Sequence, residues 1–141
     1  MIYTVTGIKE KTDYGKVLMH EHIGCISNDM IQAFGKEWLD KKKLADFAVD
    51  ILKMMKTKYG VGMIVDGTPI DLGRDIMLIK EVSERADMPI VASTGLYHYP
   101  SQITTTNDAE EIASWFIGEF ENGIEGTDIK PGILKVASDA L

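Results

Sequence analysis

Short apolar segments alternate with longer amphipathic segments along the whole chain. Between residues 37 and 59, apolar residues recur at the spacing of a helix that buries one face. The apolar segments at 16–23, 61–68, 89–95 and 132–138 have the length and composition of buried strands. Parallel strands need a crossover between them, and a helix usually provides it. The sequence therefore predicts an α/β fold with a parallel sheet.

The predicted helices carry start and stop signals. Gly60 is placed to end the first helix, and Asp71 is placed to cap the second. Asn107 and Glu110 have the spacing of a capping box for the third helix, which is expected to end near Gly123. After the first strand, each helix is therefore expected to be followed by another strand.

A β-hairpin is expected ahead of the first parallel strand. The segment YTVTGIKEKTDYGKV, residues 3–17, contains the turn signal Asp13-Tyr14-Gly15. The order βαβαβαβ that follows suits either a small open α/β sheet or half of a (β/α)8 barrel. A complete barrel typically needs ~250 residues, and this chain has 141.

Two histidines separated by one residue end the first predicted strand, VLMHEHIG. Side chains at positions i and i+2 of a strand share a face, so we expect Leu18, His20 and His22 to point the same way. Two adjacent imidazoles suit a divalent metal such as zinc. The alternative is a pair of ordinary histidines at a strand end. Glu21 points away and is not assigned as a base, because the pattern is not the helical H-E-x-x-H motif.

Lys135 lies in the middle of the apolar segment GILKVAS. Burial in an apolar strand disfavours the ammonium form and favours the neutral amine. A neutral amine can react with carbon dioxide to give a carbamate, whose two oxygens can bridge two metal ions. The alternative is a lysine at a strand end that reaches solvent.

Composition excludes several classes of protein. The formal net charge is −7, and apart from the run at 41–43 the basic residues are scattered, so nucleic acid is not an expected partner. The N-terminus lacks a signal-peptide layout, and no apolar stretch approaches the ~18 residues that span a bilayer. A cytoplasmic location is expected. Cys25 is the only cysteine, which excludes an internal disulfide, and it is expected to be a small core residue.

Four motifs together resemble the phosphotriesterase family of the amidohydrolase superfamily. They are GKVLMHEHIG, DGTPIDLGRDI, VASTGLYHYP and PGILKVASD, and they occur in the family's order and approximate spacing. The resemblance covers nearly the whole chain. It implies a TIM-barrel fold with a binuclear metal centre at the C-terminal mouth. Residues 1–141 are then expected to form one partial domain, made of a hairpin and the first four barrel strands.

The resemblance also implies roles for particular residues. His20 and His22 would bind the more buried metal, and Lys135, carboxylated, would bridge both ions. The implied activity is that of a metal-dependent hydrolase, similar to phosphotriesterase-like lactonases, in which a metal-activated hydroxide attacks a lactone, carboxyl ester or phosphoester. Tyr97 matches a tyrosine that lines the substrate pocket in lactonase-like members, although it could equally be an aromatic packed on the barrel rim. The segment 71–75 is interpreted as capping and salt-bridge structure.

The chain departs from the family pattern because it ends after the fourth strand. In the family, the fifth and sixth strands each supply a histidine and the eighth supplies an aspartate. No complete catalytic set is therefore expected, and His98 is given no role. The chain could be a truncated piece of a hydrolase, or it could pair with its own copy or a separate second half. It could also be a non-catalytic assembly module that binds a metal or nothing.

Overall fold

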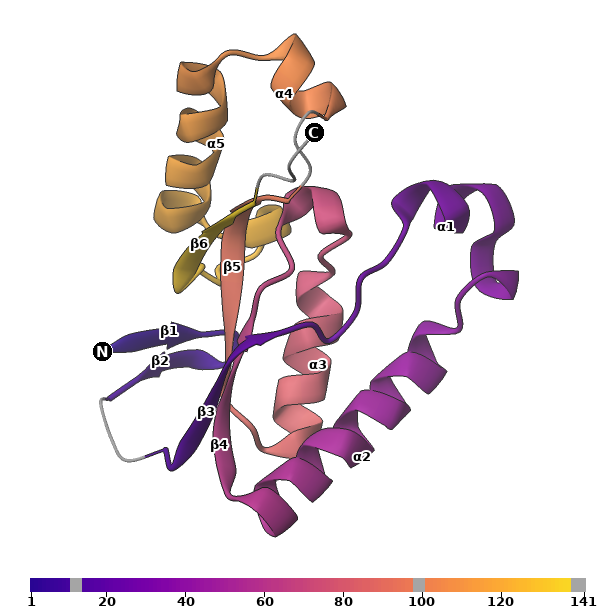
Figure 1. Ribbon diagram of the computed structural model, residues 1–141, viewed down its shortest axis with the longest axis vertical. Coiled ribbons are helices and arrows are strands. Elements are labelled where there is room, and N and C mark those ends of the chain that lie inside the picture. Colours follow the sequence, from indigo (N-terminus) through magenta and orange to yellow (C-terminus); the bar gives the residue numbers. More distant parts are fainter. Residues whose placement is uncertain (11–13, 98–100, 138–141) are drawn as a thin grey trace.

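The computed structural model describes residues 1–10, 14–97 and 101–137, and it has the predicted α/β fold (Figure 1). Four parallel strands form one sheet in the order β3-β4-β5-β6, so each strand lies beside its predecessor in sequence. The strands are β3 (Lys16–Glu21), β4 (Val61–Asp66), β5 (Ile90–Leu96) and β6 (Ile133–Val136). The sheet curls into half of a barrel, which confirms the predicted fold class.

The connecting helices cover the outer side of the curled sheet, where α2 and α3 lie next to each other (Figure 1). The helices are α1 (Asn28–Phe34), α2 (Lys41–Tyr59), α3 (Ile76–Ala86), α4 (Gln102–Thr106) and α5 (Ala109–Asn122). Helix α2 ends at Gly60, as predicted, and this residue has a left-handed backbone. Helices α1 and α4 were not predicted, because a segment of seven or five residues is too short to show helical periodicity. No helix in the described part of the chain is long and apolar enough to cross a membrane.

Helix α3 begins four residues later than predicted. Its N-cap is Asp75, whose carboxylate accepts the backbone N–H of Leu78. Asp71 lies instead in a short 3-10 turn, η2 (Ile70–Leu72), and accepts the backbone N–H of Tyr97 at 2.6 Å. Both aspartates suit a cap by residue type, but in the folded chain Asp71 contacts Tyr97, whereas Asp75 caps the helix and pairs with Lys41.

Helix α5 begins with a capping box one residue after the predicted one. Asp108 accepts the backbone N–H of Glu111, and the Glu111 side chain accepts the backbone N–H of Asp108. The predicted pair, Asn107 and Glu110, has the same spacing but does not form the box. The helix ends before Gly123, as expected.

The two faces of the sheet are both apolar, and they contact different partners. The face toward the helices contributes to a core that includes Ile64, Ile90 and Ile76 of α3. The inner face carries a smaller cluster made of Met63, Val65 and Val91, against which Val17 and Ile133 pack. The strands therefore have near-continuous apolar runs instead of alternating ones, as expected for a parallel sheet.

The predicted N-terminal hairpin is present, but its turn is elsewhere. Strands β1 (Ile2–Thr4) and β2 (Gly7–Lys9) pair antiparallel around a turn at residues 5–6. Asp13, in the predicted turn, lies outside the described residues. The buried Val5 donates its N–H to the carbonyl of Ile90 at 2.9 Å. The hairpin is thus attached to the amino end of β5, away from the strand ends where barrel enzymes place their sites.

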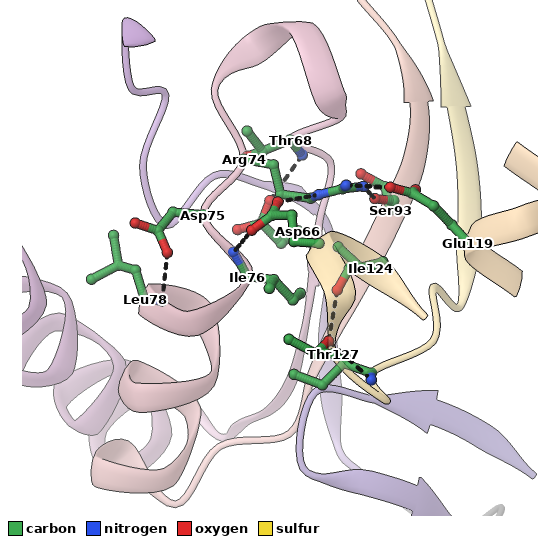
Figure 2. Close-up of polar contacts among 12 residues, drawn as sticks. Asp66, Thr68, Arg74, Asp75, Ile76, Leu78, Ser93, Glu119, Ile124 and Thr127 are labelled. Carbon is green, nitrogen blue, oxygen red and sulfur yellow. Dashed lines mark hydrogen bonds and ion pairs between the residues drawn. The ribbon is translucent and has the colours of Figure 1, made fainter. Parts of the chain in front are cut away.

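A buried ion-pair network attaches the loop after β4 to α5 (Figure 2). The Arg74 guanidinium donates to both carboxylate oxygens of Glu119, at 2.5 and 3.0 Å, and to the carbonyl of Ser93 at 2.8 Å. It also donates to Glu125 of the 3-10 turn η3 (Ile124–Gly126) at 3.0 Å, and Glu125 accepts the first N–H of α3, from Ile76. The capping and salt-bridge role predicted for 71–75 is therefore confirmed.

Candidate metal site

Two of the predicted site residues meet from opposite edges of the described sheet. The Lys135 Nζ of β6 lies 3.3 Å from the Nε2 of His20 at the end of β3. The His20 and His22 rings lie edge to face, with centroids 5.1 Å apart. The fold therefore gathers His20, His22 and Lys135 at the carboxyl-terminal end of the parallel sheet, and both imidazoles are exposed.

A β-bulge determines which way the histidines point. Leu18 pairs with Ile64 and Glu21 pairs with Asp66, so three steps along β3 match two steps along β4. Leu18 packs against the core beneath the helices, whereas His20 reaches Lys135 on β6. The predicted shared face of Leu18 and the histidines is therefore wrong, because the bulge interrupts the strand alternation between them.

Gly67, which follows β4, provides space for the two imidazoles. A Cβ atom at this position would lie 3.0 Å from the Cδ2 of His20 and 3.7 Å from the Cε1 of His22. The Gly67 N–H also donates to the carbonyl of Glu21 at 2.9 Å, which extends the β3–β4 pairing to the histidines. Sequence reasoning missed this residue, because a glycine after a strand is read first as a turn.

The most buried polar groups near the histidines are Asp66 and Thr68. The Asp66 carboxylate accepts the backbone N–H of Ile23 at 2.9 Å and that of Thr68 at 2.8 Å (Figure 2 shows the second contact). The Thr68 hydroxyl lies 2.9 Å from the Nδ1 of His22. Burial raises the pKa of Asp66, although its hydrogen bonds and His22 oppose this shift. Sequence reasoning missed both residues; the available signal was a polar D-G-T segment directly after a buried strand.

The raised pKa of Asp66 predicts a pH dependence of stability. At pH values just above 3.8, the ordinary pKa of an aspartate, the folded chain still holds a proton on the Asp66 carboxyl. The free energy of unfolding of wild type therefore falls as the pH rises from 3.8 through the raised pKa. Asp66→Asn removes the titrating group. We expect the stability advantage of wild type over this variant to shrink as pH rises from 4 to 7 in urea-unfolding measurements.

Asp87→Asn is the control with the opposite sign. Lys56 lowers the pKa of Asp87 through a side-chain hydrogen bond. The Asp87 carboxylate therefore stabilises the folded chain at neutral pH, and this stabilisation disappears as the pH falls through the lowered pKa. The advantage of wild type over Asp87→Asn is therefore expected to grow with pH. Parallel pH profiles for the two variants would contradict the assignment of a raised pKa to Asp66.

Lys135 lies in a less buried strand than the sequence predicted. Its own exposure is intermediate, and its neighbours Leu134 and Val136 are 49% and 62% exposed. The reason is that, within the described residues, β6 pairs only with β5 and its outward side chains lack a covering element. Direct backbone pairing with Gly95 fixes the position of Lys135 along the sheet.

Tyr97 and Cys25 lie near the same end of the sheet. Tyr97 follows β5 and is half-buried, and its substrate-binding role stays a prediction. Cys25 is exposed, so the prediction of a core residue is wrong: Ile23 and Ile26 take the buried positions of this loop. The thiol is partly shielded from solvent, and this desolvation, followed by the negative charge of Asp66, raises the pKa of Cys25. The reactive thiolate is therefore disfavoured. His98 lies outside the described residues.

The donor set at this site fits part of a metal site. Neutral imidazoles are good zinc ligands, and the Thr68 contact uses only the Nδ1 of His22, which leaves Nε2 available. No group of three or more His, Cys, Asp or Glu side chains that could hold a metal occurs among the described residues, so these residues alone do not complete a site.

The fold and this cluster define the class of protein: half of a (β/α)8 barrel with two histidines and a lysine gathered at the carboxyl ends of its strands. Residues 1–140 match the model of the phosphotriesterase family. The chain belongs to the phosphotriesterase family, as its motifs predicted.

Similar proteins are known from several organisms. The chain is 35% identical to a phosphotriesterase homology protein of Mycobacterium tuberculosis, over 96% of this chain and 44% of that protein. It is 32% identical to the aryldialkylphosphatase of Saccharolobus solfataricus, over 92% of this chain and 41% of that protein. It is 26% identical to the N-acetyltaurine hydrolase of Rattus norvegicus, over 94% and 46%. The chain therefore spans less than half the length of these relatives.

Proposed function

We propose that this chain supplies part of the active site of a metal-dependent hydrolase. In this proposal His20 and His22 are ligands of a divalent metal ion, and zinc is the ion that such imidazoles favour. Lys135, carboxylated on Nζ, contributes to a site for two ions. The observation that carries the proposal is the 3.3 Å approach of Lys135 to His20 across 115 sequence positions.

The residues around the cluster have separate tasks in this proposal. A bound metal supplies Lewis-acid polarisation of the scissile bond and lowers the pKa of water. His20 and His22 present their imidazoles at the open end of the sheet, where substrate and water can reach them. Gly67 allows the two rings to lie close together, and Thr68 holds one edge of the His22 ring.

The proposed substrate is a phosphoester, a lactone or a carboxyl ester. The name of the Saccharolobus relative, aryldialkylphosphatase, supports the phosphoester, and the name N-acetyltaurine hydrolase supports hydrolysis more broadly. Tyr97 is proposed to line the substrate pocket, because it follows β5 at the end of the sheet where the metal ligands lie. A cytoplasmic location is also part of this proposal.

The remaining ligands are proposed to come from a second half-barrel. The described chain leaves apolar side chains exposed on β6 and on the adjoining helix α5, namely Leu134, Val136, Trp115, Ile117 and Phe120. A partner that continues the sheet beyond β6 would cover the two on β6 and pair the free strand edge. This partner is either further polypeptide of the hydrolase or a second copy of this chain. The competing function is an assembly module without catalysis.

Native mass spectrometry of the zinc-treated chain tests the proposal, because one spectrum reports both bound metal and assembly. Wild type is expected to retain zinc, and His20→Ala and His22→Ala are expected to lose it, because each removes a direct ligand. His98→Ala is the matched control and is expected to retain zinc. Equal zinc content in all four chains would contradict the metal assignment.

Hydrolysis assays on the same samples separate the two functions. A zinc-dependent rate with an aryl phosphotriester, a lactone or an aryl ester would eliminate the assembly module. Zinc retention by a dimer of the chain, with no hydrolysis of any of the three, would instead favour that module. Chelation followed by readdition of zinc should remove and restore any genuine rate.

A further inference from the structure

Among the described residues, the His22 ring has one hydrogen-bond partner, Thr68, in addition to its edge-to-face contact with His20. Its Nδ1 lies 2.9 Å from the Oγ1 of Thr68, a distance typical of a good hydrogen bond. Thr68 is 1% exposed, whereas the His22 ring lies in the open. The hydroxyl therefore approaches from inside the protein and leaves the other ring nitrogen directed to the exposed side.

The direction of this hydrogen bond follows from which ring nitrogen would bind a metal ion. A neutral imidazole has one hydrogen, and the nitrogen that lacks it is the metal ligand. Because Nε2 is directed to the exposed side, the hydrogen is placed on Nδ1, and the Thr68 hydroxyl oxygen accepts it.

The same contacts hold the main chain next to His22. Ile23 directly follows the histidine, and its N–H is fixed by Asp66 at 2.9 Å. Asp66 is the last residue of β4 and is fully buried. One carboxylate thus holds the backbone beside His22 and, through the backbone N–H of Thr68, the residue whose hydroxyl contacts the His22 ring.

We propose that Asp66 and Thr68 are positioning residues that fix His22 in the tautomer protonated on Nδ1, with the Nε2 lone pair directed outward to a metal ion. The tautomer is measured on the metal-free chain, and the choice of Nε2 as the metal-binding nitrogen rests on the function proposed above. A metal ligand of this kind is oriented by the hydrogen bond that its second nitrogen makes.

His20 provides an internal comparison. Its Nε2 lies near the Lys135 amine, and no hydrogen bond to Thr68 or Asp66 is found for it within the described residues. A change at Thr68 that acts through the hydrogen bond should therefore alter His22 and leave the tautomer of His20 as it is. A general disturbance of the strand ends would alter both.

The test uses ¹⁵N NMR of the imidazole nitrogens in the metal-free chain near pH 8, where unperturbed histidines are neutral. The chain has only three histidines, so assignment by single substitutions is practical. Wild type and Thr68→Ser, which keeps the hydroxyl, should show His22 protonated on Nδ1. Thr68→Val, similar in shape without the hydroxyl, should show a mixture of the two tautomers. Backbone spectra establish that each variant is folded.

Zinc affinity, measured by competition with a chelating indicator, gives the second readout. Thr68→Val is expected to bind zinc about 10–100-fold more weakly than wild type, and Thr68→Ser is expected to stay close to wild type. Wild-type His22 protonated on Nε2, or an unchanged His22 tautomer in Thr68→Val, would overturn the proposal. If the tautomer changes as expected but wild type binds no zinc, the positioning pair stands and the proposed metal function fails.

Discussion

Replacing Arg74 with methionine is expected to lower the free energy of unfolding by about 3–5 kcal/mol. The Arg74 side chain is 3% exposed, and its guanidinium is bonded to Glu119, Glu125 and the carbonyl of Ser93. Methionine fills much of the same volume but leaves two carboxylates and a buried carbonyl without their donor. The network also joins the loop after β4 to α5, so its loss weakens the contact between these elements. Chemical denaturation followed by circular dichroism measures the change.

Arg85→Met is the matched control, because it removes the same charge from the surface. Arg85 pairs with Asp46 and with Glu81, and its side chain is 38% exposed. Exposed ion pairs of this kind contribute about 0–1 kcal/mol. A loss of less than about 1 kcal/mol for Arg74→Met, similar to that of the control, would show that the Arg74 network does not hold the fold together.

Replacing Gly95 with alanine is expected to lower the free energy of unfolding by about 2–6 kcal/mol and to abolish zinc binding at the proposed metal site. Gly95 has a φ of +117°, which side-chain-bearing residues rarely adopt, and a Cβ here would lie 1.9 Å from the carbonyl oxygen of Lys135. Because backbone atoms cannot move aside singly, β6 must separate from β5. Lys135 then leaves the neighbourhood of His20. Denaturation and zinc titration of the same variant measure both effects.

Gly118→Ala is the matched control for this substitution. Gly118 lies within α5, and the nearest atom to an added Cβ is the Asn122 side-chain nitrogen at 4.0 Å. Alanine in a helix interior is more stable than glycine by about 0.5–1 kcal/mol, so this variant should gain stability and keep zinc. If Gly95→Ala behaves in the same way, the close pairing of β5 and β6 does not determine the position of Lys135.

Strong local patterns were sufficient to predict most of the elements. The apolar periodicity of α2 and the left-handed Gly60 that ends it are properties of adjacent residues, and both were predicted. The start of α3 was misplaced because Asp71 and Asp75 are the same residue type four positions apart; in the structure Asp75 caps the helix and Asp71 accepts the Tyr97 N–H. Cap choices of this kind depend on contacts from distant parts of the chain.

The amino-acid sequence by itself determined the half-barrel class, the family, and the candidate ligands His20, His22 and Lys135, because alternating apolar segments and short motifs are local properties. Only the tertiary structure decided how these ligands meet. The bulge in β3 turns His20 toward Lys135, Gly67 makes room for the rings, and buried Asp66 and Thr68 contact the chain around His22. Each of these contacts joins the carboxyl end of β3, or the loop after it, to another strand or the loop that follows it, and pairing register between strands is set by packing of the whole sheet.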